Sequence, residues 1–328
     1  MEGTKHIDPH VHCRDWEQSY KATIRSVTDL ARSQGVVAFI DMPNTTPPIT
    51  TEELVRRRLE TAENEGCLDG YYLNVGATRD PAQIREAVRL AESNPHVAGI
   101  KLFAGKSVGG LNVPDEEGQR IVYKALAEAG YNGVLAVHCE KESLFRAGLW
   151  DATKPYTWGL ARPREAEIES VRDQIRIATE CGVKAHLHIC HISVPDAVLL
   201  VDEARKGMRI SCGATPHHLT LSAEDMLTAD RVEYKVNPPI RKHSDMKRLR
   251  ELLKAGKIDL IETDHAPHTP SEKAYGANKP GESYMSGIQS LGAYASFLEG
   301  LKKDGFTDGQ ISRLTYENVK RVFAKIVE

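Results

Sequence analysis

The sequence has little of several features that mark particular classes of protein. It holds six cysteines in 328 residues, none of them in a C-x-x-C pair, which argues against a disulfide framework. No apolar run approaches the length of a membrane span, and the N-terminus lacks a basic segment followed by an apolar one. The net charge of -3 gives no bulk attraction to nucleic acid or to an anionic membrane. These absences predict a cytoplasmic protein with no nucleic-acid or membrane partner.

The chain does contain a regular alternation of short apolar runs and amphipathic helical stretches. Several of the short runs are bounded by polar residues or glycine, as expected for strands that are covered on both faces. Eight strands with helices between them predict an α/β fold, a (β/α)8 TIM barrel, with a doubly wound open sheet as the alternative. The expected strands are 5–12, 36–42, 71–77, 98–103, 134–139, 184–190, 209–213 and 258–264. The expected helices are 19–34, 51–65, 81–93, 115–129, 164–181, 195–206, 243–255 and 286–302.

Two histidines stand in the first expected strand. His10 and His12 are separated by one residue, and Arg14 follows two residues later. Because side chains alternate along a strand, all three project from the same side. Two imidazoles at one strand end are suited to bind zinc or a similar divalent metal. The arginine beside them indicates an anionic substrate.

Residues able to bind a metal recur near the ends of other expected strands. In a barrel, the carboxyl ends of the strands carry the catalytic groups. Any one of these residues alone is explained as well by core packing or by a helix cap. Their presence on five strands at one rim of the barrel favours a metal site instead. The residues are His10 and His12 on the first strand, Lys101 on the fourth, His138 on the fifth, His188 and His191 on the sixth, and Asp264 on the eighth.

Lys101 lies within an apolar strand, where an unpaired charge is costly. One explanation is a neighbouring carboxylate that pairs with it. The other is that nearby metal ions favour its neutral amine. A neutral amine can add carbon dioxide and become a carbamate, whose oxygen atoms can bridge two metals.

Six short motifs, spread in order over nearly the whole chain, carry a family resemblance. Together they resemble the amidohydrolase superfamily, the cyclic amidohydrolases, and within it the dihydroorotases. The motifs are Asp8-x-His10-x-His12-x-Arg14, Met42-Pro43-Asn44-Thr45, Gly99-Ile100-Lys101-Leu102, Val137-His138-Cys139-Glu140, His188-Ile189-Cys190-His191 and Thr263-Asp264-His265-Ala266-Pro267-His268.

The resemblance implies a zinc-dependent hydrolase with two Zn²⁺ ions in one binuclear site. Asp264 is also the implied catalytic residue, which takes the proton of the attacking hydroxide and delivers it to the departing nitrogen. His188 competes with His191 as the ligand on the sixth strand, and the motif match favours His191. The implied ligands are His10, His12 and Asp264 on one metal, His138 and His191 on the other, and a carboxylated Lys101 bridging both.

The implied reaction is the reversible cyclisation of N-carbamoyl-L-aspartate to L-dihydroorotate, the third step of de novo pyrimidine biosynthesis. This small-molecule substrate carries a carboxylate, for which Arg14 can supply a bidentate contact. The resemblance adds Asn44, Asn237 and His268 as further substrate-binding residues.

Arg14 and Asn44 discriminate best between the possible substrates, but each also has a purely structural explanation. Arg14 can pair with Asp15 or Glu17 at the surface, and Asn44 can merely shape a Pro-Asn-Thr-Thr-Pro-Pro turn.

Two other functions fit the same motifs. One is a hydantoinase-like or allantoinase-like cyclic amidohydrolase, whose substrate lacks the carboxylate. The other is a metal-free, inactive scaffold for aspartate transcarbamoylase. The resemblance also allows a homodimer and an association with aspartate transcarbamoylase.

Residues 1–328 are expected to form one metal-dependent hydrolase barrel domain, with the small β-sandwich of many relatives absent or vestigial. Segments 105–110 and 237–241 are the candidates to close over substrate, and 265–287 is expected to be a long functional loop.

Overall fold

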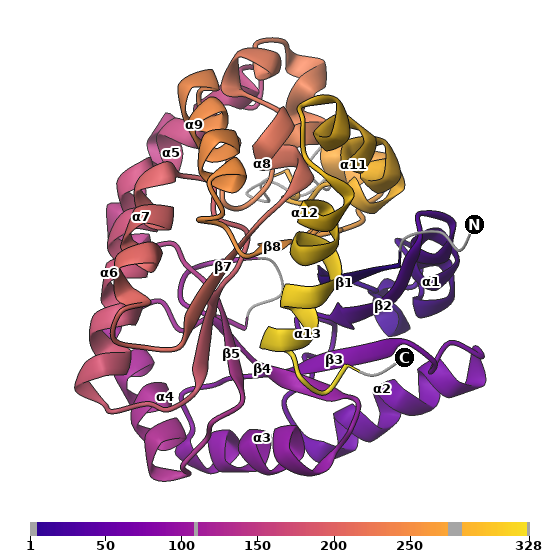
Figure 1. The fold of residues 1–328 in the computed structure, drawn as a ribbon, viewed down its shortest axis with the longest axis vertical. Helices are drawn as coiled ribbons and strands as arrows, with labels where there is room; N and C mark the ends of the chain where they lie inside the picture. The colour runs from indigo at the N-terminus through magenta and orange to yellow at the C-terminus, as the bar shows by residue number, and fades with distance from the viewer. Residues whose placement is uncertain (1–4, 108–110, 275–283, 327–328) are drawn as a thin grey trace.

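The computed structural model describes residues 5–107, 111–274 and 284–326. Its strands form one eight-stranded sheet in which neighbours follow the order of the chain and every pair is parallel (Figure 1). Such an order requires a crossover after each strand, and helices supply most of them. The strands are β1 His6–Val11, β2 Val36–Asp41, β3 Tyr71–Gly76, β4 Val97–Phe103, β5 Val134–His138, β6 His186–Ile189, β7 Ile210–Ala214 and β8 Leu260–Ile261.

The residues that follow β8 close the sheet onto β1. The His12 amide donates to the His265 carbonyl at 2.9 Å, and Val11 pairs with His265 in a parallel bridge. The expected (β/α)8 barrel is therefore confirmed. The last strand is shorter than the expected 258–264, because the Thr263 amide donates to the Asp8 carboxylate at 3.0 Å instead of continuing a backbone ladder.

Local sequence signals explain where the outer helices begin. The side chains of Thr23, Thr51, Asp80 and Asp115 each accept a hydrogen bond from an amide in the first turn of the helix that follows. These helices surround the barrel, as the ribbon shows (Figure 1). The larger helices are α1 Ile24–Ser33, α2 Glu52–Asn64, α3 Pro81–Ser93, α4 Glu116–Glu128, α6 Arg164–Glu180, α7 Pro195–Ala204, α9 His243–Lys254 and α11 Tyr294–Lys303. The short ones are α5 Trp158–Ala161, α8 Pro216–Thr220, α10 Pro270–Ala274, α12 Asp308–Ser312 and α13 Asn318–Val322.

The expected helix 286–302 is wrong at its start. Residues 284–289 carry no helix, and Ile288 pairs with His265 in a parallel bridge. The Ile288 carbonyl accepts from the Ala266 amide at 3.0 Å. A 3-10 turn, Ser290–Ala293, then leads into α11. The apolar spacing of this segment is helical, but its first residues form hydrogen bonds with the chain that follows β8.

The C-terminal helix closes one end of the barrel. Val319, Val322 and Phe323 pack with residues near the amino ends of the strands, such as Ile7 and Val134. In Figure 1, α13 lies across this end. The site must therefore be sought at the other end, where the strands finish and where barrels carry their catalytic groups.

The described residues form no helix that is long and apolar enough to cross a membrane. Of the segments expected to be functional loops, 108–110 and 275–283 lie outside the described residues. Within those residues, the barrel sheet contains every named strand, so the described part holds no β-sandwich.

Candidate metal centre and substrate pocket

His10, in β1, and His12, which follows that strand, meet an aspartate that follows β8. Asp264 Oδ1 lies 3.0 Å from His12 Nε2 and 3.4 Å from His10 Nε2. All three side chains are buried, and one donor atom from each lies within 4.8 Å of the others. The backbone of Asp264 has a φ of 46°, a conformation that non-glycine residues seldom adopt. Two imidazole nitrogens and one carboxylate oxygen make a donor set that suits zinc.

A second pair of histidines lies beside the first. His138 is the last residue of β5, and its Nδ1 is 3.3 Å from Nε2 of His191, which follows β6. The ring of His191 has its centroid 5.0 Å from that of His10, so the two pairs form one cluster. His191 also has a left-handed backbone, with a φ of 39°.

Lys101 is fully buried in β4, at the same cluster. Its Nζ donates to Cys190 Sγ at 3.0 Å and lies 5.2 Å from the centroid of the Phe103 ring. Within the described residues, no carboxylate oxygen forms an ion pair with this amine. Pairing with a neighbouring carboxylate therefore does not explain its burial.

His188, the competing residue on the sixth strand, is turned away from the cluster. Its Nδ1 is 2.9 Å from the Ser211 hydroxyl, and its Nε2 is 3.1 Å from Glu262 Oε2. Both ring nitrogens are thus engaged inside the barrel. The geometry favours His191 over His188 as the residue available to a metal.

The electrostatics of the cluster suit a cation. Burial lowers the pKa values of His10 and His191 well below the ordinary value of histidine, and it lowers the pKa of His12 to about 3. The three rings are therefore neutral, as metal ligands must be. Burial raises the pKa of Asp264 to about 7, although the charge of Lys101 opposes this. In the described part of the chain, Nδ1 of His10 and Nδ1 of His191 have no hydrogen-bond partner. These residues fit one or two divalent ions.

Three buried carboxylates support this cluster: Asp8 and Glu140 stand in quoted motifs but were given no role from the sequence, and Glu262 was not named. Asp8 accepts from Thr263, which fixes the segment before Asp264. Glu262 accepts from the His191 amide and from His188. Glu140 Oε2 lies 3.1 Å from His138 Nε2. A charged residue inside an apolar strand was the available signal for Glu262, as it was for Lys101.

Arg162 holds Glu140 in place from outside the strand. Its Nε donates to Glu140 Oε1 at 3.0 Å, and its Nη2 donates to the other carboxylate oxygen. Burial alone would raise the pKa of Glu140, but Arg162 and His138 hold it at about 2. Glu140 is therefore an anion that stays beside His138.

Arg14 points into the pocket rather than to the surface. Its Nε donates to the Pro267 carbonyl at 3.1 Å, and its Nη2 is 3.2 Å from His268 Nε2. Asp15 instead lies 3.2 Å from Arg58, so the pairing of Arg14 with Asp15 does not form. Burial lowers the pKa of Arg14 to about 10, which leaves it a cation at neutral pH.

Two of the other three expected substrate residues, Asn237 and Asn44, line the same cavity, whereas His268 does not. Asn237 lines it, and its side-chain oxygen accepts from Trp158 Nε1 at 3.1 Å. Asn44 also lines it, but Asn44 Oδ1 accepts from His12 Nδ1 at 2.8 Å, so Asn44 supports a metal-site histidine. The lining consists of His10, His12, Arg14, Asn44, Phe103, Ser107, His138, His191, Val236, Asn237, Asp264, Ala266, Ser286 and Gly287.

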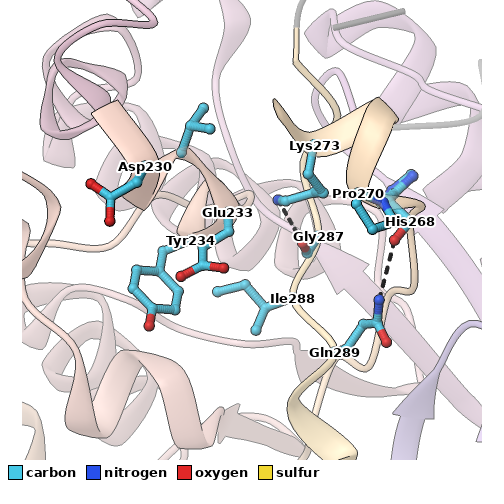
Figure 2. A pocket seen from close by; sticks show the side chains of 10 residues that line it. Asp230, Glu233, Tyr234, His268, Pro270, Lys273, Gly287, Ile288 and Gln289 are labelled. Carbon is cyan, nitrogen blue, oxygen red and sulfur yellow. Dashed lines mark hydrogen bonds between the residues drawn. The ribbon is translucent and has the colours of Figure 1, made fainter. Parts of the chain in front are cut away.

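A larger cavity, of about 410 Å³, adjoins this pocket and is shown in Figure 2. Gly287 lines both cavities, and His268, the neighbour of Arg14, lines the larger one. None of the expected metal ligands lines the larger cavity. The larger cavity therefore meets the candidate pocket at Gly287, and His268 belongs to its side of the boundary.

Comparison with known proteins agrees with this arrangement. The chain is 32% identical to the dihydroorotase of Methanosarcina mazei over 330 residues, which cover 97% of this chain and 69% of that protein. It is 30% identical to the dihydroorotase of Fusobacterium nucleatum, with 97% and 72% covered. The dihydroorotase of Brevibacillus brevis is 36% identical over 83% of this chain. The chain spans 62% of the length of that relative. No family model matches.

Solved structures share the fold. An L-hydantoinase from Arthrobacter aurescens superposes with a TM-score of 0.83 at 23% identity, covering 98% of this chain and 71% of that one. A dihydroorotase from Saccharomyces cerevisiae, in complex with 5-fluoroorotic acid, superposes with a TM-score of 0.78 at 20% identity, covering 99% and 85%. At these identities, the likeness concerns the barrel.

Proposed function

Because the chain belongs to the dihydroorotase family, we propose that it interconverts N-carbamoyl-L-aspartate and L-dihydroorotate. The observation that carries this proposal is the buried Arg14 guanidinium, next to His268 and in the cavity that holds the histidine cluster. A cation fixed in a buried position at a pocket is suited to a substrate with a carboxylate.

The proposed cofactor is a pair of Zn²⁺ ions. His10, His12 and Asp264 would hold one ion, and His138 and His191 the other. A carboxylated Lys101 would bridge them. The support is the donor set itself, with buried neutral imidazoles and the buried carboxyl group of Asp264, whose pKa burial raises to about 7. When bound, such ions would lower the pKa of the attacking water and polarise the scissile carbonyl.

The residues of the chain then have separate tasks in the reaction. Asp264 takes the proton of the attacking water and gives it to the ring nitrogen as the carbon–nitrogen bond breaks. In the cyclising direction, it takes a proton from the attacking nitrogen and gives it to the departing hydroxide, which leaves the carbonyl carbon as water. Arg14 and His268 hold the carboxylate of the substrate, and Asn237 borders its ring. Asn44 accepts a hydrogen bond from His12 and so fixes the orientation of that histidine ring.

The test is a comparison of L-dihydroorotate with hydantoin, which lacks the carboxylate. Wild-type protein loaded with zinc should hydrolyse dihydroorotate far better than hydantoin. Arg14→Ala should lose about 2 kcal/mol or more of transition-state binding, roughly 30-fold in kcat/KM, on dihydroorotate alone. Arg25→Ala, at an exposed arginine paired with Asp29, is the control and should behave like wild type. Good turnover of hydantoin with none of dihydroorotate would overturn the assignment.

Metal analysis separates the enzyme from an inactive scaffold for aspartate transcarbamoylase. We propose that the zinc-loaded chain binds about two ions per chain, as binuclear hydrolases do. Fewer than one ion after zinc supplementation would favour the scaffold. We further propose a cytoplasmic location, in which the six cysteines, all free in the structure, remain reduced.

A further inference from the structure

A short segment, Tyr284–Gly287, forms part of the wall of the candidate pocket. Ser286 and Gly287 line the cavity that contains the histidine cluster. Gly287 has a φ of 153°, and a Cβ there would come within 3.0 Å of His268 Cδ2. A shift of this segment would therefore press on His268, the neighbour of Arg14.

One buried lysine ties this segment to a second part of the chain. Lys273, on α10, donates from its Nζ to the Lys235 carbonyl at 2.8 Å, the Met285 carbonyl at 3.1 Å and the Gly287 carbonyl at 2.7 Å. Three carbonyls use all three N–H groups of an ammonium. The contact with Gly287 is drawn in Figure 2.

A second lysine holds the same segment from the other side. Lys235 Nζ donates to the Tyr284 carbonyl at 2.5 Å and to the Ser286 hydroxyl at 2.8 Å. It also lies 3.9 Å from the centroid of the Trp158 ring, whose Nε1 donates to Asn237. The Gly287 amide returns a hydrogen bond to the Lys235 carbonyl at 2.9 Å.

Two lysine amines buried beside each other are costly to charge: burial lowers the pKa of Lys273 to about 7 and that of Lys235 well below its ordinary value, so their hydrogen bonds must compensate for the lost water. Among the described residues, neither forms an ion pair with a carboxylate, and their partners are backbone carbonyls, one hydroxyl and an aromatic face. All four residues of Tyr284–Gly287 are held in this way, by alternate lysines. These hydrogen bonds hold in place a segment that lies in no helix and no named strand.

We propose that Lys235 and Lys273 are positioning residues that fix the Tyr284–Gly287 wall, and through it His268 and Arg14, for substrate binding. The proposal rests on the proposed function, because the wall bounds the proposed substrate pocket. Among the described residues, the hydrogen bonds of the two amines go to Tyr284, Met285, Ser286, Gly287 and the Lys235 carbonyl, and none goes to an expected metal ligand. Their loss should therefore change substrate binding rather than metal binding.

The test compares Lys273→Met with Lys325→Met. Lys325 is a matched control, because its Nζ also donates to backbone carbonyls, those of Ala91 and Asn94, away from the pocket. Hydrogen exchange of a peptide that covers 284–289 should be on the order of tenfold faster in Lys273→Met and unchanged in the control. KM for L-dihydroorotate should rise on the order of tenfold, with a smaller change in kcat and an unchanged zinc content.

Unchanged exchange in Lys273→Met would overturn the proposal whatever the activity, and so would faster exchange with an unaltered KM. If wild type does not turn over dihydroorotate, the proposed function fails and the exchange comparison still decides whether the lysines fix the wall. Lys273→Arg keeps a basic group, but a planar guanidinium cannot direct three N–H groups from one nitrogen at three carbonyls. Its KM should therefore lie between those of wild type and Lys273→Met. Should Lys273→Met not fold, Lys235→Met tests the same segment.

Discussion

Asn44 Oδ1 accepts a hydrogen bond from His12 Nδ1 at 2.8 Å, and this contact leaves His12 Nε2 facing Asp264 at 3.0 Å. An amide oxygen at this place holds the proton of the imidazole on Nδ1 and keeps the lone pair of Nε2 directed at the metal position. The asparagine was expected to contact substrate, and the geometry gives it a second task as the orienting partner of a ligand.

Replacing Asn44 should therefore weaken metal binding as well as catalysis. Asn44→Leu keeps most of the volume but removes the acceptor, and we expect zinc affinity to fall about 10- to 100-fold. Competition with a chelator of known affinity measures this. Asn44→Asp, which retains an acceptor, should bind zinc more tightly than Asn44→Leu. A raised KM with unaltered zinc affinity in both variants would show that Asn44 acts on substrate alone.

Glu262 should be needed to hold His188 and His191 in position below the candidate metal site. It accepts from His188 Nε2 and from the His191 amide, and Gly213 leaves the room for its carboxylate. Glu262→Ala leaves two buried donors unpaired, each at a cost of about 1–3 kcal/mol. We expect Tm to fall by several degrees and zinc content to drop, with Glu262→Gln affected less. A Cβ at Gly213 would overlap the carboxylate, so Gly213→Ala should lose zinc too. Wild-type Tm and zinc content in Glu262→Ala would contradict this role.

The parts of the structure that could be predicted from the sequence are those governed by local patterns. Strands covered on both faces give short apolar runs, and a parallel barrel places their carboxyl ends at one rim. His138 and Lys101 could be assigned to that rim because their own strands are plain in the sequence. The start of α11 could not be predicted in this way, because Ile288 pairs with His265. Helical spacing of apolar residues does not reveal such a backbone partner.

The contacts that orient the site residues join distant parts of the chain, so no local pattern reveals them. Asp8 reaches Thr263 across 255 positions, and Arg162 reaches Glu140 from the residue that follows α5. The ion pair that Arg14 could have formed with Asp15 is absent for the same reason. Asp15 pairs with Arg58, which lies on α2. Composition and spacing identify candidate ligands, whereas their orientation depends on tertiary packing.

Arg58 should contribute strongly to stability. It is fully buried, with Nη2 2.7 Å from Asp41 Oδ2, and its Nη1 donates to the Arg14 carbonyl at 3.1 Å. Arg58→Met leaves Asp41 as an uncompensated buried charge, and we expect unfolding free energy to fall by about 3–5 kcal/mol in urea titrations. Arg56→Met, at an exposed arginine paired with Glu60, is the matched control and should leave the midpoint unchanged. Equal midpoints for the two variants would show that the buried network adds little.

Lys101 should make zinc binding depend on bicarbonate. Its amine is fully buried beside Cys190, at a site whose imidazoles are neutral, and a neutral amine adds carbon dioxide with release of one proton. The resulting carbamate supplies oxygen ligands of the kind zinc accepts. Metal-free protein reloaded with zinc in buffer free of carbon dioxide should therefore bind fewer ions, and regain less activity, than in buffer with bicarbonate. Lys101→Gln keeps the length without the amine, so it should bind fewer ions in both buffers and show no response. Equal zinc content of wild type in the two buffers would mean that Lys101 is not carboxylated.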